Sequence, residues 1–219
     1  MKKTTKVLLL LLCAVMLVAG SVMGTLAFLT SQDAVTNTFT VGNVKIELDE
    51  AKVGEDGRYT DHSIRVKAND YHLLPGMTYD KDPTVTVKQP SDKAYIRMLV
   101  KVANINNLMT VFDDPSYYGA DGVFLLQNLI SGWDPTIWVF EGRTFEGTTG
   151  VYEFRYFAPV DAKNGDVVLD DLFETITIPG EEVTSDNIGL LDAVQIDVVA
   201  QAIQEAGFAN ADAAWAAFN

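Results

Sequence analysis

The sequence has very few residues of the types that carry catalysis or metal binding. Its 219 residues include one cysteine, Cys13, and two histidines, His62 and His72. Neither histidine stands in a His-Glu-x-x-His pattern, and the chain has no Gly-x-Ser-x-Gly motif. This shortage argues against a zinc centre, a cysteine nucleophile and a disulfide framework. We therefore predict a protein that is not an enzyme and has no catalytic, cofactor-binding or metal-binding residues.

Basic residues are also scarce, and acidic residues dominate the charge. The chain has 16 Lys and Arg against 30 Asp and Glu, a formal net charge of −14. Such a surface repels phosphate backbones and anionic lipid headgroups, so we expect no nucleic-acid partner. It favours a soluble monomer whose self-association depends on salt or pH.

The chain lacks an apolar run long enough to span a bilayer, which needs about 20 residues. Its longest run covers residues 7–19. A basic lead precedes this run: Lys2, Lys3 and Lys6. Thr25 and Ala27 fit positions −3 and −1 of a signal-peptidase site. We therefore predict a secretory signal peptide over residues 1–27, cut between Ala27 and Phe28, and a secreted protein without a permanent membrane anchor.

The position of the cut has two alternatives, Gly20 and Gly24. Cleavage after Ala27 removes three lysines and no acidic residue, so the formal charge changes from −14 to −17. Cys13 leaves with the signal peptide, and the exported chain then has no thiol. About 190 residues bury an adequate core without disulfides.

The segment after the cut has an alternating apolar pattern that changes phase. The two sets are Val35, Phe39 and Val41 at odd positions, and Val44, Ile46 and Leu48 at even positions. One continuous strand would place these sets on opposite faces. Gly42 stands at the change, as a bulge, as the first residue of a hairpin turn, or as a hinge between two separately used strands. We favour the hinge. Residues 28–42 would then form a polymerisation strand that leaves its own domain and inserts the side chains of Val35, Phe39 and Val41 into another copy of the protein. The alternative is that Phe39 and Val41 pack in their own domain.

Residues 43–219 read as one mainly β domain with short antiparallel strands. The clearest strands, 95–103 and 190–202, alternate apolar and polar side chains, which indicates a sandwich. We expect a loop over residues 50–61 and a small helical insertion over about 104–133. Two helical segments are expected in the insertion, because apolar residues recur there at helical spacing in two sets: Leu108, Met109 and Phe112, then Val123, Leu126 and Ile130. Asn210 is the expected N-cap of a short C-terminal helix.

Several short motifs, taken in order, resemble one family of exported proteins. They are Gly24-Thr-Leu-Ala-Phe-Leu-Thr, Asn37-Thr-Phe-Thr-Val-Gly-Asn-Val, Leu74-Pro-Gly, the Pro83-Thr-Val run, Ala94-Tyr-Ile-Arg, Ala200-Gln-Ala-Ile-Gln, Gly207-Phe and Ala214-Trp. Together they are similar to the TasA/camelysin family of Gram-positive bacteria. The resemblance implies a jelly-roll-like β-sandwich and a signal peptide cut by a dedicated W-type signal peptidase. It also implies a biofilm-matrix fibre, in which the N-terminal segment of one subunit completes the sheet of the next.

The expected function is therefore a secreted structural subunit of extracellular-matrix fibres, polymerising by donor-strand exchange. Its expected partners are other copies of the chain, the signal peptidase during export, and an accessory matrix protein. Two alternatives stay open. Some members of the family are described as metalloendopeptidases, and others are minor or accessory surface proteins.

Overall fold

A computed structural model describes residues 43–69, 71, 74–120, 124 and 126–218. All of them belong to one compact unit, Asn37–Asn219. The predicted signal peptide and polymerisation strand, residues 1–42, lie outside the described residues. Within the described part, no helix is long and apolar enough to cross a membrane.

The largest sheet is built around β5 (Ser91–Ala103). Its antiparallel strand order is β12-β5-β8-β7, and β9 also pairs with β5. The other bounds are β7 Trp138–Glu146, β8 Thr149–Tyr156, β9 Val160–Ala162 and β12 Gln195–Gln204. Ile96, Met98, Val100 and Val102 are all buried, as their alternation predicts, because strand side chains point to opposite faces in turn.

The second sheet is antiparallel and has the order β10-β4-β1-β2. Its bounds are β1 Lys45–Val53, β2 Tyr59–Val66, β4 Thr84–Lys88 and β10 Val167–Val168. The predicted loop over residues 50–61 is too long, because β1 continues to Val53 and β2 already begins at Tyr59. Asp82 and Asn69 accept hydrogen bonds from the backbone N–H groups of Ala51 and Val53, which keeps this polar stretch extended.

A third, small sheet and a shared core complete the β structure. The order is β3 (Thr78–Asp80), β11 (Thr175–Thr177), β6 (Ile130–Ser131), again antiparallel. One hydrophobic cluster contains Val85 of β4, Met98 of β5 and Ile176 of β11, so all three sheets pack on the same core. The prediction of a mainly β, antiparallel fold is confirmed.

The helical parts are shorter than the sequence predicts. Within the expected insertion, 104–133, the structure has α2 (Ile105–Val111) and two 3₁₀ turns, η1 (Pro115–Tyr117) and η2 (Leu126–Asn128). The second helical segment expected there is instead η2 followed by β6. Ile130 pairs with Ile176 in the small sheet, and this tertiary pairing overrides the helical spacing.

The C-terminal helix, α3 (Ala211–Ala217), begins as predicted. The side-chain oxygen of Asn210 accepts a hydrogen bond from the backbone N–H of Ala213 at 2.9 Å. The helix packs Trp215 on the outer side of the largest sheet, where its ring lies 4.3 Å from the guanidinium of Arg97. One short internal helix and one short C-terminal helix therefore accompany the sheets.

Candidate functional site: the open edge of β12

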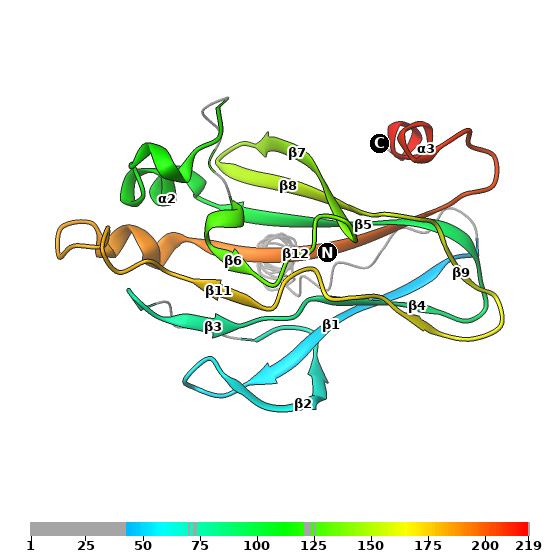
Figure 1. Ribbon diagram of the computed structural model, residues 1–219, viewed down its shortest axis with the longest axis horizontal. Helices are drawn as coiled ribbons and strands as arrows, with labels where there is room; N and C mark the ends of the chain where they lie inside the picture. Colours follow the sequence, from blue (N-terminus) through cyan, green and yellow to red (C-terminus); the bar gives the residue numbers. More distant parts are fainter. Residues whose placement is uncertain (1–42, 70, 72–73, 121–123, 125, 219) are drawn as a thin grey trace, which may run out of the picture. The chain divides into compact units, whose positions relative to one another are not determined.

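β12 is a long strand at the edge of the largest sheet (Figure 1). Its ten residues pair with β5 in one unbroken antiparallel register, from Gln195 opposite Ala103 to Gln204 opposite Ala94. Among the described strands, β5 is its only ladder partner. The other long side of β12 is therefore an edge in the described part of the fold.

The backbone groups on that edge belong to the even-numbered residues. Just past the strand, the N–H of Glu205 donates to the carbonyl of Lys93 at 2.8 Å, which makes 205 and 93 a hydrogen-bonded pair. Such pairs alternate along an antiparallel ladder, so the odd residues of β12 bond to β5. The even residues point their N–H and C=O groups the other way: Ile196, Val198, Ala200, Ala202 and Gln204.

The other sheet edges among the described residues carry features that discourage strand addition. β7 has a bulge between Phe140 and Gly142, where Gly142 adopts a φ of 133° that favours glycine. β2 shifts register twice against β1. β3, β6 and β10 have two or three residues each. β12 alone among these edges is both long and regular.

A pocket of about 420 Å³ opens at the first residues of β12. Its buried walls are Tyr79 of β3, Ile176 of β11, and Leu191 and Val194, which precede β12. Polar groups stand at its rim, including Asn69 and the exposed side chains of Gln195 and Asp197. The pocket thus has apolar walls and lies beside the open edge, between the largest and the smallest sheet.

Two tyrosines form the aromatic side of the pocket. The rings of Tyr71 and Tyr79 meet edge to face with centroids 5.9 Å apart. The hydroxyl of Tyr71 donates to the carbonyl of Asp80 at 2.9 Å, and the hydroxyl of Tyr79 accepts from the N–H of Leu74 at 2.6 Å. Burial, together with the nearby negative charge of Glu50, raises the pKa of Tyr71 well above its ordinary value, so this phenol stays neutral.

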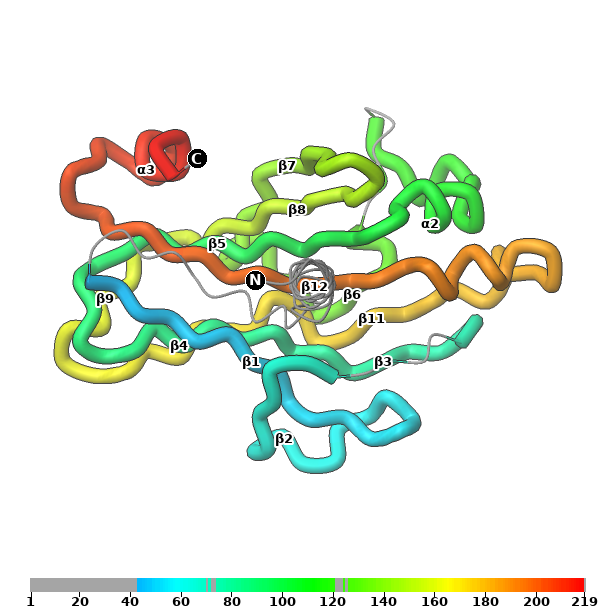
Figure 2. Tube along the Cα trace, turned by 180° about the vertical axis from the view of Figure 1, so that it is seen from behind, coloured from blue at the N-terminus to red at the C-terminus, as the bar shows by residue number. Residues whose placement is uncertain are grey.

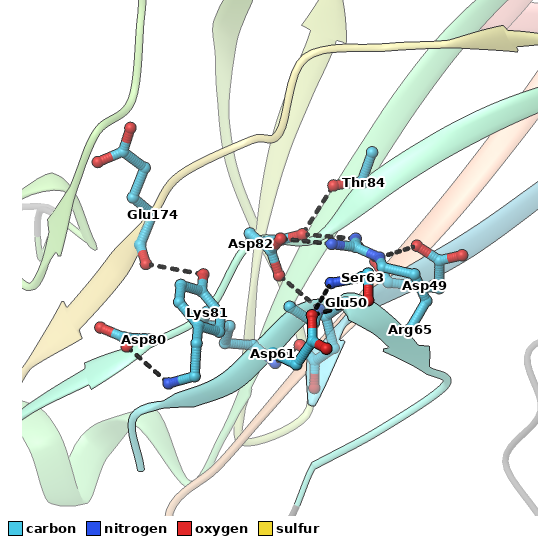
Figure 3. A network of polar contacts seen from close by, with 12 residues as sticks. Asp49, Glu50, Asp61, Ser63, Arg65, Asp80, Lys81, Asp82, Thr84 and Glu174 are labelled. Atoms are coloured by element: carbon cyan, nitrogen blue, oxygen red, sulfur yellow. Dashed lines mark hydrogen bonds and ion pairs between the residues drawn. The ribbon is translucent and has the colours of Figure 1, made fainter. Parts of the chain in front are cut away.

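Lys81 contributes a buried positive charge to the same wall. Lys81 is 9% exposed and its ammonium group pairs with Glu50, which is 4% exposed (Figure 3). The ammonium also lies 5.1 Å from the centre of the Tyr71 ring. The side-chain amide and the backbone N–H of Asn69 both donate to Glu50 at 2.9 Å, so both oxygens of this carboxylate are used. The charges are therefore compensated within the fold.

A second ion cluster ties β2 to β1. Figure 3 shows Arg65 lying between Asp49 and Asp82. Its Nε atom is 2.8 Å from Asp49, and Asp82 also accepts the N–H of Ala51 at 2.7 Å. Desolvation lowers the pKa of the Arg65 guanidinium, but the two carboxylates outweigh it and the net shift is upward. These contacts tie β2 to β1 and to the residue two positions before β4.

The space between the free edge of β12 and the neighbouring strand β1 narrows from the pocket toward the Gln204 end of β12. Ala200 and Ala202 are buried there in the same cluster as Val44, just before β1. Figures 1 and 2 show β1 and β12 close together where β1 begins and diverging farther along, and β1 contacts β12 directly. The edge is thus a wedge, wide at Ile196 and narrow at Ala202.

The residues that the sequence marks for polymerisation and cleavage cannot be placed on this site. Ala27, Phe28, Val35, Phe39, Val41 and Gly42 all lie outside the described residues. Of the alternating pattern, only the even-numbered set lies in the described part, where Ile46 and Leu48 of β1 pack against the main core; this packing does not choose between a bulge, a hairpin turn and a hinge at Gly42. The roles of residues 28–42 stay predictions.

The histidines give no support to a zinc centre. His62 is exposed and its ring lies 3.9 Å from the ring of Tyr59, and His72 is outside the described residues. In the part of the chain that is described, no group of three His, Cys, Asp or Glu side chains is placed to hold a metal ion. The metalloendopeptidase alternative stays an untested prediction.

Sequence reasoning predicted a missing strand but did not say which edge accepts one. The available signal was the unbroken alternation of residues 194–202, without proline or glycine, in contrast to the glycine in β7. The pocket had no signal in the sequence, because Lys81 and Glu50 are 31 residues apart and Tyr79 and Ile176 lie still farther apart.

Comparison with known proteins adds no further constraint. No protein-family model, no curated protein and no solved structure matches this chain.

Proposed function

We propose that this protein is a secreted structural subunit of extracellular-matrix fibres, which polymerises when the N-terminal segment 28–42 of one copy pairs with β12 of another. The observation that carries the proposal is the ten-residue, regular edge of β12, whose outer side pairs with no other strand in the described part of the chain. The resemblance of the sequence to the TasA/camelysin family supports the same function. The cut after Ala27 would supply the free leading end that donation requires.

The physics of a sheet edge explains why strand addition fits this site. An edge presents unpaired N–H and C=O groups, which a donated strand satisfies with main-chain hydrogen bonds. Alternate side chains of the added strand then enter pockets between the sheets and give specificity. A head-to-tail contact of this kind does not close on itself, so it builds filaments instead of dimers. A minor or accessory subunit would use the same contact at the end of a fibre.

A proline substitution on β12 tests the acceptor edge directly. In Val198→Pro the missing N–H is one that points away from β5, so the β5 ladder keeps its hydrogen bonds. We expect a folded protein by circular dichroism and thermal unfolding that no longer forms filaments in electron micrographs. Filaments of normal length and number from this variant would refute the acceptor role of β12.

Val199→Pro is the matched control for this experiment. Its N–H faces Leu99 in the β5 ladder, so the substitution removes an internal hydrogen bond of the sheet. We expect Val199→Pro to lower the unfolding temperature more than Val198→Pro. This contrast separates loss of the edge from loss of the fold.

A deletion tests the donor. Purified protein beginning at Gly42 lacks residues 28–41, including Val35, Phe39 and Val41, but keeps every residue of the described fold. We expect it to stay monomeric under conditions in which protein beginning at Phe28 forms filaments. Added full-length protein is expected to extend onto its free acceptor edge, and undiminished assembly of the shortened chain alone would contradict the donor role.

A further inference from the structure

We infer that segment 28–42 enters the β12 edge antiparallel to β12, with Phe39 in the pocket, and that only the segment of a second copy can do so. This inference rests on the proposed function and specifies its partner and its direction. It follows from three features: where the segment is attached to the fold, how far it can reach, and how the width of the edge varies.

The segment is attached at the narrow end of the edge. The carbonyl of Asn43 accepts a hydrogen bond from the N–H of Asp92 at 3.0 Å. The next residue, Lys93, bonds to Glu205, which directly follows β12. Asn43 therefore lies at the end of β12 marked by Gln204, and the pocket, which is lined by Gln195, Ile196 and Asp197, lies at the opposite end.

This attachment sets the direction in which a molecule's own segment could lie. Chain leading toward Asn43 along β12 runs from the pocket end to the Gln204 end, which is the direction of β12 itself. Self-pairing is therefore parallel. Antiparallel pairing would require residues near Asn43 to lie at the pocket end.

The short length of chain between Thr40 and its attachment point at Asn43 excludes the antiparallel arrangement within one molecule. Thr40 is three residues from Asn43 and extends at most about 10 Å from it. From Glu205 to Asp197 the strand is eight residues long, about 27 Å. The segment's last residues can occupy the pocket end only when they come from another copy.

The shape of the edge favours the antiparallel arrangement. The largest inserting side chain in the segment is Phe39, near its end. Parallel pairing would place Phe39 at the narrow end, against the small, buried Ala200 and Ala202. Antiparallel pairing places it at the pocket of about 420 Å³, beside the rings of Tyr71 and Tyr79, and leaves the smaller Val35 at the narrow end. Antiparallel ladders are also slightly more stable per residue.

Engineered disulfides test the direction, because the chain from Phe28 onward contains no cysteine. Asp197 is exposed on β12. In an extended donor strand, Thr40 would stand on the side opposite Phe39, because neighbouring strand side chains alternate between faces. We expect mild oxidation of assembled Thr40→Cys/Asp197→Cys protein to give a ladder of covalent oligomers on non-reducing gels. Thr38→Cys/Asp197→Cys covers a register shifted by two residues, since a disulfide needs its Cα atoms within about 7 Å.

Thr40→Cys/Glu205→Cys is the matched reporter of parallel pairing. We expect no ladder and no internal cross-link from it in assembled protein. A ladder or an internal cross-link from Thr40→Cys/Glu205→Cys would overturn the inferred direction. Filaments that cross-link through neither of the two Asp197→Cys variants would also overturn it. If protein beginning at Phe28 forms no filaments and no cross-links at all, the proposed function itself fails, together with the inference.

The pocket is tested by substitution in the donor. We expect Phe39→Ala to raise the protein concentration needed for filament growth by about tenfold or more, and Val35→Ala to raise it much less. Neither residue belongs to the described fold, so the monomer's thermal unfolding serves as the control for each. Equal effects of the two substitutions, or a larger effect of Val35→Ala, would contradict the placement of Phe39 in the pocket.

Discussion

At the scale of single residues, the buried pair of Lys81 and Glu50 has the largest expected energetic effect. Removing one partner leaves the other charge buried and unpaired, which costs about 3–5 kcal/mol. We expect Lys81→Met to lower the free energy of unfolding by roughly this amount, measured by urea denaturation. The double variant Lys81→Met/Glu50→Gln should regain most of the loss, because the introduced amide is neutral and its oxygen can still accept from Asn69. A single variant as stable as the parent protein would contradict this account.

Asp171 gives the fold a dependence on pH. Its carboxyl group is half-buried, and desolvation raises its pKa in the folded protein; a backbone hydrogen bond opposes this rise, and the charges of Glu174 and Asp82 add to it. The folded state then binds a proton more readily than the unfolded chain. This contribution to stability is complete below the ordinary aspartate pKa of about 3.9 and is lost as pH rises through the raised folded-state pKa.

Asp171→Asn should therefore stabilise the protein at neutral pH, because it removes a carboxylate that folding desolvates. We expect the difference in unfolding free energy between variant and parent to shrink as the pH falls toward about 4. Urea denaturation at a series of pH values measures it. A difference that stays constant across the series would show that Asp171 does not titrate differently in the two states.

At the scale of secondary-structure elements, α3 depends on its cap. Seven residues are too few for a stable isolated helix, so α3 persists through the Asn210 cap and the packing of Trp215. We expect Asn210→Ala to destabilise this helix by about 1 kcal/mol, seen as faster hydrogen exchange of its backbone amides. Asn210→Asp, which caps equally well, should exchange like the parent protein. Unchanged exchange in Asn210→Ala would assign the stability of α3 to Trp215 alone.

At the scale of the whole molecule, net charge opposes assembly. Copies that begin at Phe28, as the proposed function requires, would have a formal charge of −17 and repel one another, and salt would screen this repulsion. We expect filament growth to accelerate between roughly 10 mM and 150 mM salt, as the Debye length falls from about 30 Å to about 8 Å. Light scattering measures the rate. Slower growth at higher salt would indicate that attractive charge pairs dominate the contact between copies.

The sequence by itself determined the features that local patterns encode. The buried face of β5 and the inward half of β12 follow from alternation alone, and the start of α3 follows from Asn210, because strand faces and helix caps depend on neighbours within a few residues. Local spacing failed at Ile130, whose partner Ile176 is distant in the chain. Polarity also failed as a guide at residues 50–53, which stay extended through Asp82 and Asn69.

Only the tertiary structure decided which edge stays open and where it is wide. Ile196 and Ala202 look alike in the pattern of one strand, yet one lies beside a pocket and the other against the beginning of β1. That difference depends on how the sheets diverge, and on walls contributed by residues such as Tyr79 and Ile176 that are nearly a hundred positions apart. Packing between distant segments sets such geometry, and no local pattern of side chains records it.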